Sequence, residues 1–477
     1  MSSLQKAQLG IAKPQCQIKH IEPIGPLQPG FWRQRSPRIQ TGIQLANSAE
    51  NFRWISDDSL ALALRMIGRF VLITFVGYYL LDSLAKLLNL RSLQTRVPNE
   101  FLDVYDAYRY RRSQEYTKWN TWFDLVVSTI DLAALLSFWF LGGFEALDQL
   151  IRAFHLPPVV NGLLYLAALC VGREALMLPF EIFHTFVIEQ RYGFNRTTVA
   201  TFVVDRLKEW LIGGLLLALL TFIILSLFEA FGLRAWMIAW ICSAGLSVML
   251  IYIAPTVILP LFFKLSPVPD GPLRDKVIEF SVRQRFPVRE LLVIDGSRRS
   301  SKANAFFTGF GSNKRIALYD TLINNHTVPE LLAVLAHEIG HFKKHHIVRH
   351  LIIGQFNLLL LFVGASFCIS RPELFETFGI STRSYYVGFA LYLVLIRPFA
   401  VLFGVLVNYW SRRDEFEADR FAAETLGDPN PLIQALKRLS KDSLSNLTPH
   451  PLLVSLHFTH PPVLARVLAL KEVGSSK

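Results

Sequence analysis

Residues 331–341 read Leu-Leu-Ala-Val-Leu-Ala-His-Glu-Ile-Gly-His, an apolar stretch that carries His337, Glu338 and His341 at its end. Histidines four positions apart project from the same face of an α-helix. Two imidazoles at that spacing can bind one zinc ion at about 2.0–2.1 Å. Glu338 lies next to the first histidine and can act as general base on a zinc-bound water. The stretch therefore predicts a catalytic zinc helix.

The His-Glu-x-x-His motif is short, so it also occurs by chance in proteins that bind no zinc. The alternative to a zinc site is a polar helix face with two solvated histidines. The apolar flank argues against that alternative, because a solvated face is rarely so apolar. A histidine-rich continuation follows at His345, His346 and His350. We expect it to be a cytoplasmic helix end, where cations suit the helix dipole, rather than part of a metal site.

A catalytic zinc needs a third protein ligand and an open position for water. Acidic residues for that role follow the last apolar run, within Ser411–Asp419. Spacing alone does not rank Asp414, Glu415 and Glu417, and a charged helix start is the alternative. Asp419 lies one helical turn after Glu415 and could accept a hydrogen bond from a ligand histidine.

The composition indicates a membrane protein. Of 477 residues, 52% are hydrophobic and 18% are charged, whereas soluble proteins carry about 25% charge. Runs long enough for a membrane helix, which needs about 20 residues, cover residues 70–90, 122–143, 159–188, 209–230, 235–263, 351–370 and 385–410. We therefore expect an all-α, multi-pass integral membrane protein with about seven transmembrane helices and the lipid bilayer as a partner.

Basic residues alternate between the loops. Segments 91–121, 189–208 and 264–350 are rich in Arg and Lys, whereas the loops between them carry few. Basic loops stay in the cytoplasm, so we expect the catalytic segment on the cytoplasmic side. The sequon at Asn195 then lies in a cytoplasmic loop, where we expect it to be unused.

The net charge of +12 fits an anionic membrane surface. We expect no nucleic-acid partner, because no zinc finger, RNA-recognition signature or isolated basic domain is present. The four cysteines show no metal-binding spacing, and we expect neither a disulfide framework nor a cysteine metal site.

Five parts follow along the chain. Residues 1–65 form a polar extension, which we expect to be disordered. Residues 66–263 hold transmembrane helices one to five, and residues 351–410 hold helices six and seven. Between them, residues 264–350 form a soluble insertion with strand-like runs at 290–294 and 315–319. Residues 411–477 form a C-terminal catalytic segment with the third zinc ligand.

With these motifs the chain resembles the type I CAAX prenyl endopeptidases, integral-membrane zinc metalloproteases, from about residue 98 to 470. The third-ligand motif of that family stands here as Asn408, Ser411, Arg412, Glu415 and Asp419. The resemblance assigns Glu415 as the third ligand. It also places Asp419 and Asn408 in the shell around the ligands.

A second motif, Ala303–Phe310, is similar to the edge strand of that family. An extended peptide can pair with such a strand through its main chain. The resemblance therefore implies substrate binding along this strand by Asn304, Ala305, Phe306, Phe307 and Thr308. Phe306 replaces the usual tyrosine of the family, which removes a hydroxyl and keeps an aromatic ring.

A third motif comprises His457, His460, Pro461, Pro462 and Arg466. In relatives the first histidine and the arginine lie near the metal and are thought to bind substrate or the oxyanion. The resemblance therefore implies catalytic roles for His457 and Arg466. For the residues His460 to Pro462 a structural turn is an equal alternative.

The resemblance implies transmembrane helices that enclose a chamber, with a zincin-like HExxH catalytic domain that contains a small β element. It implies one Zn²⁺ per chain, a peptide or protein substrate that is prenylated at its C-terminus, and a monomer. The location would be the endoplasmic reticulum in a eukaryote or the plasma (inner) membrane in a bacterium.

Two alternatives remain. One is a quality-control metalloprotease for non-prenylated membrane proteins, as in the HtpX-type heat-shock proteases. The other is a transporter or scaffold with a degenerate site. Against the latter, His337, Glu338, His341 and Glu415 are all present.

Overall fold

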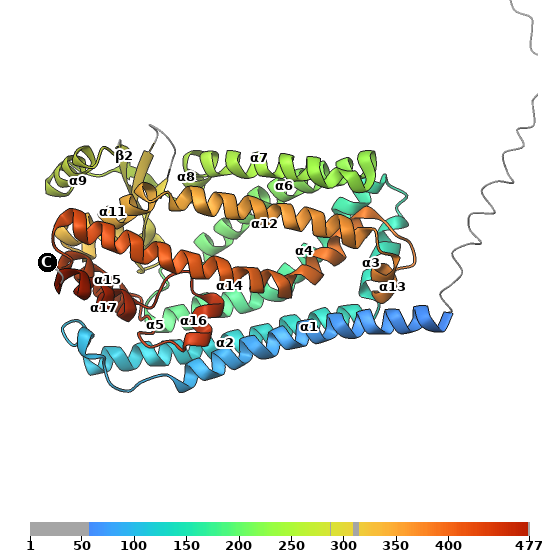
Figure 1. Ribbon diagram of the computed structural model, residues 1–477, viewed down its shortest axis with the longest axis horizontal. Coiled ribbons are helices and arrows are strands. Elements are labelled where there is room, and N and C mark those ends of the chain that lie inside the picture. Colours follow the sequence, from blue (N-terminus) through green and yellow to red (C-terminus); the bar gives the residue numbers. More distant parts are fainter. Residues whose placement is uncertain (1–56, 287, 309–313, 476–477) are drawn as a thin grey trace, which may run out of the picture. The chain divides into compact units, whose positions relative to one another are not determined.

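The computed structural model describes residues 57–286, 288–308 and 314–475. The expectation of disorder for residues 1–56 falls outside the described residues. Long helices make up most of the described part, and a small four-stranded sheet lies at one end of it (Figure 1).

Seven long helices carry the apolar runs. They are α1 (Asp57–Arg91), α2 (Ala107–Phe140), α4 (Pro158–Phe183), α6 (Val199–Phe231), α7 (Ala235–Ile253), α12 (His346–Ile369) and α14 (Tyr385–Leu426). Six apolar helical segments in the described residues are long enough to cross a membrane, and one of them, Val199–Ile251, has 53 residues. A straight helix of that length would be about 80 Å long, far more than the hydrocarbon core of about 30 Å.

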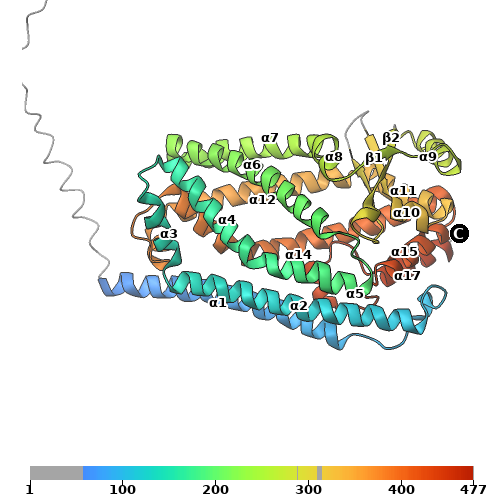
Figure 2. The ribbon, with the colours of Figure 1, turned by 180° about the vertical axis from the view of Figure 1, so that it is seen from behind.

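That long segment turns back on itself. The tight turn η4 (Gly232–Arg234) separates α6 from α7, and Gly232 takes a positive φ of 59° that favours glycine. The two helices pack against each other (Figure 2). The described chain therefore has the seven membrane helices that the sequence predicts.

Short elements connect these helices. They are η2 (Asn99–Phe101), α3 (Gly143–Arg152), η3 (His184–Glu189), α5 (Gln190–Tyr192), η5 (Ala254–Ile258), α8 (Leu259–Phe262) and α13 (Pro372–Thr377). Elements α3 and α13 lie at the end of the bundle that is remote from the sheet (Figures 1 and 2). A buried cluster with Trp139, Phe144 and Phe378 holds them there.

The other end, residues 264–343 and 411–475, is here called the head. Its strands are β1 (Leu265–Pro267), β2 (Val288–Ile294), β3 (Ala305–Thr308) and β4 (Lys314–Tyr319). They pair in the order β1-β2-β4-β3, with β2 and β4 parallel and the outer pairs antiparallel. The head contains the predicted small β element, and β3 is one edge of the sheet.

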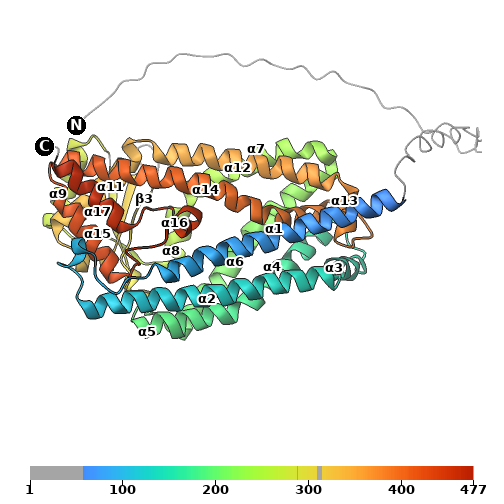
Figure 3. The same ribbon diagram turned by 60° about the horizontal axis from the view of Figure 1, so that its bottom comes forward.

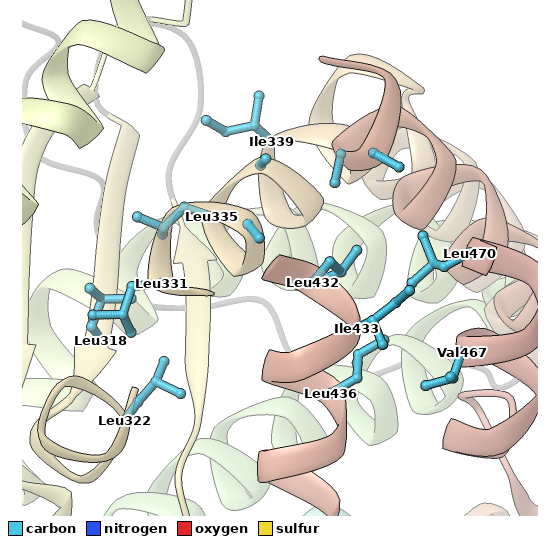
Figure 4. Close-up of a cluster of buried hydrophobic side chains, with 14 of the residues drawn as sticks. Leu318, Leu322, Leu331, Leu335, Ile339, Leu432, Ile433, Leu436, Val467 and Leu470 are labelled. Atoms are coloured by element: carbon cyan, nitrogen blue, oxygen red, sulfur yellow. The ribbon is translucent and has the colours of Figure 1, made fainter. Parts of the chain in front are cut away.

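Helices complete the head. They are α9 (Pro272–Arg283), α10 (Asp320–Asn325), α11 (Val328–Lys343), α15 (Asn430–Asp442), α16 (Pro451–His457) and α17 (Val463–Ser475). Helix α11 buries Leu331, Leu335 and Ile339, which are spaced four apart on one face. The buried cluster around them joins the sheet to α15 and α17 (Figure 4).

Two boundaries differ from the sequence prediction. Helix α1 begins at Asp57 rather than after residue 65. The predicted division at residue 410 falls inside α14, which continues to Leu426. Residues 411–426 contain neither proline nor glycine, so nothing in the sequence ends the helix where the apolar run ends. The last membrane helix therefore extends into the head.

Candidate active site

Helix α11 begins at a capping box. The Glu330 side chain accepts from the Thr327 backbone N–H at 2.9 Å, and Thr327 caps the helix in return. Near the end of α11, a Cβ added to Gly340 would lie 3.2 Å from the backbone of Ala418 on α14. Glycine therefore allows the two helices to approach closely just where the histidines lie.

Three side chains converge at this crossing. His337 Nε2 and His341 Nε2 lie 3.1 Å apart, and they lie 3.6 and 3.3 Å from the two carboxylate oxygens of Glu415. Ligands bound tetrahedrally at about 2.0–2.1 Å lie about 3.3 Å from one another. These donors therefore fit one zinc ion in spacing and in chemistry.

The structure also ranks the neighbouring acids. Spacing left Asp414, Glu415 and Glu417 open as the third ligand. Among the described residues, Glu415 is the one of these acids that groups with both His337 and His341. Asp414 and Glu417 form a separate group with His346. Helical spacing could not supply this ranking, because it depends on which face of α14 meets α11, whereas the resemblance had already indicated Glu415.

A carboxylate orients the first histidine. Asp419 Oδ1 lies 2.9 Å from His337 Nδ1, which fixes the tautomer that leaves Nε2 free for a metal. Asp419 is 2% exposed. The structure thus places Asp419 where the sequence expects it.

Arg466 contacts the carboxylates of the site rather than the open space in front of them. Its guanidinium contacts Asp419 at 2.6 and 2.8 Å and Glu415 at 2.9 Å. Burial opposes the charged form, but Asp419 and Glu415 outweigh it and raise the pKa of Arg466. The resemblance implies that Arg466 binds substrate or the oxyanion, whereas in the structure it anchors two carboxylates.

His457 and His460 differ from their expected places. His457 Nε2 bonds to Asp82 on α1 at 2.7 Å, because it ends α16, which packs against α1. His460 Nε2 instead lies 3.3 Å from Glu415 Oε1, and its side chain is 64% exposed. Of the two histidines, the structure therefore pairs His457 with Asp82 and brings His460 to Glu415, whereas the resemblance pointed to His457. His460 belongs to the same motif, but spacing alone could not choose between them.

Asn408 contacts helix α16 rather than one of the three converging side chains. Its side-chain N–H donates to the Leu456 carbonyl at 3.0 Å. Arg412, one turn further on, donates to the carbonyls of Val454 and Phe458 at 3.0 and 2.7 Å. These bonds fasten α16 to α14, and they hold the chain that leads to His460.

The predicted substrate strand lies beside helix α11, which carries His337 and His341. Strand β3 pairs with β4 on one side only among the described strands, and it contacts α11. The Asn304 carbonyl accepts from the Tyr319 N–H at 3.0 Å and extends the ladder. An open strand edge can take an extended peptide.

A cavity of about 740 Å³ opens onto the site. Glu338, His460 and the three converging side chains line its end. From there it runs between α7 and α12, which contribute Ser247, Ile251, Leu351, Gly354, Gln355 and Leu358. The site could therefore hold a cation beside the carboxylate of Glu338, at the end of a largely apolar channel.

Two families have models that match this chain. The model of the CAAX prenyl protease N-terminal region, with five membrane helices, matches residues 86–264. The model of peptidase family M48 matches residues 267–473.

Individual proteins are similar to this chain over most of its length. "Probable CAAX prenyl protease 1" of Schizosaccharomyces pombe is 34% identical and covers 79% of this chain and 82% of its own. "CAAX prenyl protease 1 homolog" of Arabidopsis thaliana is 32% identical and covers 83% of this chain and 96% of its own. The crystal structure of S. mikatae Ste24p superposes with a TM-score of 0.79 at 30% identity, covering 84% of this chain and 98% of that one.

Proposed function

Since the chain belongs to peptidase family M48, we propose that it is a zinc metalloendopeptidase that cleaves prenylated CAAX-type proteins or peptides near their C-terminus. The observation that carries the proposal is the convergence of His337, His341 and Glu415 beside Glu338 at the end of the cavity. The names of the relatives support the substrate class.

The residues divide the chemistry among them. His337, His341 and Glu415 would hold the zinc, which when bound would acidify a water and polarise the scissile carbonyl. Glu338 takes the proton of the attacking water and delivers it to the leaving amine nitrogen. His460 faces the same space and can donate a hydrogen bond to the carbonyl oxygen as negative charge develops there.

Substrate binding uses the edge of the sheet and the cavity. A peptide adds as a strand along Asn304 to Thr308, with its scissile bond at Glu338. The apolar lining between α7 and α12 offers a place for a hydrocarbon chain that is attached close to the scissile bond. An edge strand recognises the main chain of the peptide, so selectivity falls to the cavity.

The cellular setting is part of the proposal. The basic loops support a cytoplasmic head, in the endoplasmic reticulum of a eukaryote or the plasma membrane of a bacterium. One chain contains all the proposed site residues, so a monomer suffices for the chemistry.

The test is cleavage of a farnesylated CAAX peptide by detergent-purified protein, beside the same peptide without the farnesyl group. We expect cleavage of the farnesylated peptide, loss of cleavage with a chelator, and a decrease of about 10²–10⁴-fold in Glu338→Gln. Equal cleavage of both peptides would favour the quality-control role instead. Cleavage that persists in Glu338→Gln would contradict the mechanism.

A further inference from the structure

We propose that His346, supported by Glu417, is a positioning residue that orients His341 for the metal. His341 Nδ1 and His346 Nδ1 lie 2.9 Å apart, and His346 Nε2 lies 3.1 Å from Glu417 Oε2. The inference rests on the proposed zinc site and deepens it, because it concerns how one zinc ligand is held.

The proton positions follow from metal binding. If His341 binds through Nε2, its only proton is on Nδ1, and that N–H must donate. His346 Nδ1 must then accept, so the proton of His346 is on Nε2. That N–H faces Glu417, and Asp414 Oδ1 lies 3.7 Å away. Every proton in the chain from His341 to Glu417 therefore has an acceptor.

The backbone between the two helices creates this contact. Helix α11 ends at Lys343, and His345 takes a left-handed conformation with φ of 59°. Helix α12 therefore starts in a new direction, and its first residue, His346, lies against His341. His346 is 1% exposed, so the contact is shielded from water.

The two ligand histidines are held differently. His337 donates directly to the carboxylate of Asp419, whereas His341 donates to a neutral imidazole. The carboxylate of Glu417 is thus one ring further from the metal. An imidazole in this place orients His341 without adding a negative charge beside the ligand, which leaves the metal a stronger Lewis acid.

A second metal ion at His346, Asp414 and Glu417 is the competing interpretation, because their donor atoms lie close together. A metal on His346 Nε2 would leave the proton of His346 on Nδ1. With zinc also on His341 Nε2, two N–H groups would then face each other at 2.9 Å. Asp414 is moreover paired with Arg349 and His350. The geometry favours one metal and a positioning histidine.

The test measures zinc affinity of full-length protein in detergent by competition with a chelator. His346→Leu removes the acceptor, and we expect zinc affinity to fall about 10–100-fold. His346→Asn keeps an acceptor oxygen near the place of Nδ1, and we expect it to bind zinc much more tightly than His346→Leu. The exposed neighbour variant His345→Asn, which tolerates the left-handed conformation, should bind zinc as the wild type does.

Glu417→Ala tests the same chain of hydrogen bonds without removing a buried side chain, because the Glu417 side chain is 40% exposed. We expect a smaller loss of zinc affinity and a lower kcat with little change in KM. Wild-type affinity in both His346→Leu and Glu417→Ala, or two zinc ions per wild-type chain, would overturn the inference. A wild-type chain that binds no zinc would instead overturn the proposed function itself.

Discussion

Arg466 shows how single side chains stabilise the site. One guanidinium contacts both the proposed ligand Glu415 and Asp419, the partner of His337. All three side chains are buried. Two carboxylates this close would repel each other, and the arginine between them offsets that repulsion.

Arg466→Met should therefore be strongly destabilising. Removal of the cation leaves two buried carboxylates without the positive charge that they share, at a cost of about 3–5 kcal/mol. We expect a lower Tm in detergent and weaker zinc retention. Arg420→Met, at an exposed position of α14, is the matched control, and an equal decrease in Tm for both variants would contradict this role.

At this scale the sequence predicted the residues that share one helix. His337, Glu338 and His341 follow from helical spacing alone. Glu415, Asp419 and Arg466 come from other segments, and resemblance rather than spacing singled them out. The resemblance points to His457, whereas the structure places His460 beside Glu415. Which of the two histidines reaches the site depends on the bonds that Asn408 and Arg412 make to α16, and the sequence does not record those bonds.

Among the elements, α14 connects the membrane to the site. Its 42 residues would extend about 63 Å. The first part packs in the membrane bundle, Asn408 and Arg412 hold α16, and Glu415 and Asp419 meet α11. The apolar run ended at residue 410, so hydropathy alone predicted a boundary that the backbone does not have.

Helix α15 is fixed by an ion pair at its solvent side. Lys437 is 6% exposed and its Nζ contacts both oxygens of Asp103 at 2.9–3.0 Å. Burial works against ionisation of Asp103, but hydrogen bonds from Lys437 and Gln434 outweigh it and lower the pKa of Asp103. The carboxylate therefore contributes stability while it is charged.

Asp103→Asn should lower the stability at neutral pH by about 1–2 kcal/mol, between the values for exposed and buried pairs. A lowered folded-state pKa means that this contribution is full above the unfolded pKa of about 3.9. The contribution of Asp103 to stability is lost as the pH falls through the pKa of Asp103 in the folded protein. The difference in Tm between wild type and Asp103→Asn should thus shrink between pH 5 and pH 3, while Glu424→Gln serves as an exposed control. A constant difference would exclude the ion pair as its cause.

At the scale of the whole molecule, the head and the α3–α13 end lie at opposite ends of the membrane helices (Figure 3). Length and composition predicted the seven helices. Strand-like runs predicted β2 and β4, the resemblance indicated β3, and β1 was not predicted. The course of the cavity between α7 and α12 was not predictable. It depends on which faces of the membrane helices pack together, and uniformly apolar sequences carry little information about that packing.

Cysteine labelling tests the topology. We expect Lys276→Cys in α9 and Thr382→Cys before α14, both exposed positions, to react from opposite sides of sealed vesicles with an impermeant maleimide. The background protein has serine in place of Cys16, Cys170, Cys242 and Cys368. The cytoplasmic side should be that of Lys276→Cys, since basic loops flank the head. Labelling of both positions from one side would contradict the arrangement.

Zinc content is the most direct test of the central claim, a metal site shared by α11 and α14. Detergent-purified wild-type protein, measured by elemental analysis, should contain one zinc ion per chain. Glu338→Gln should keep it, because Glu338 is not a ligand, whereas Glu415→Ala, at a position outside the HExxH helix, should lose it. Zinc retained in Glu415→Ala, or lost in Glu338→Gln with the fold intact, would contradict the account.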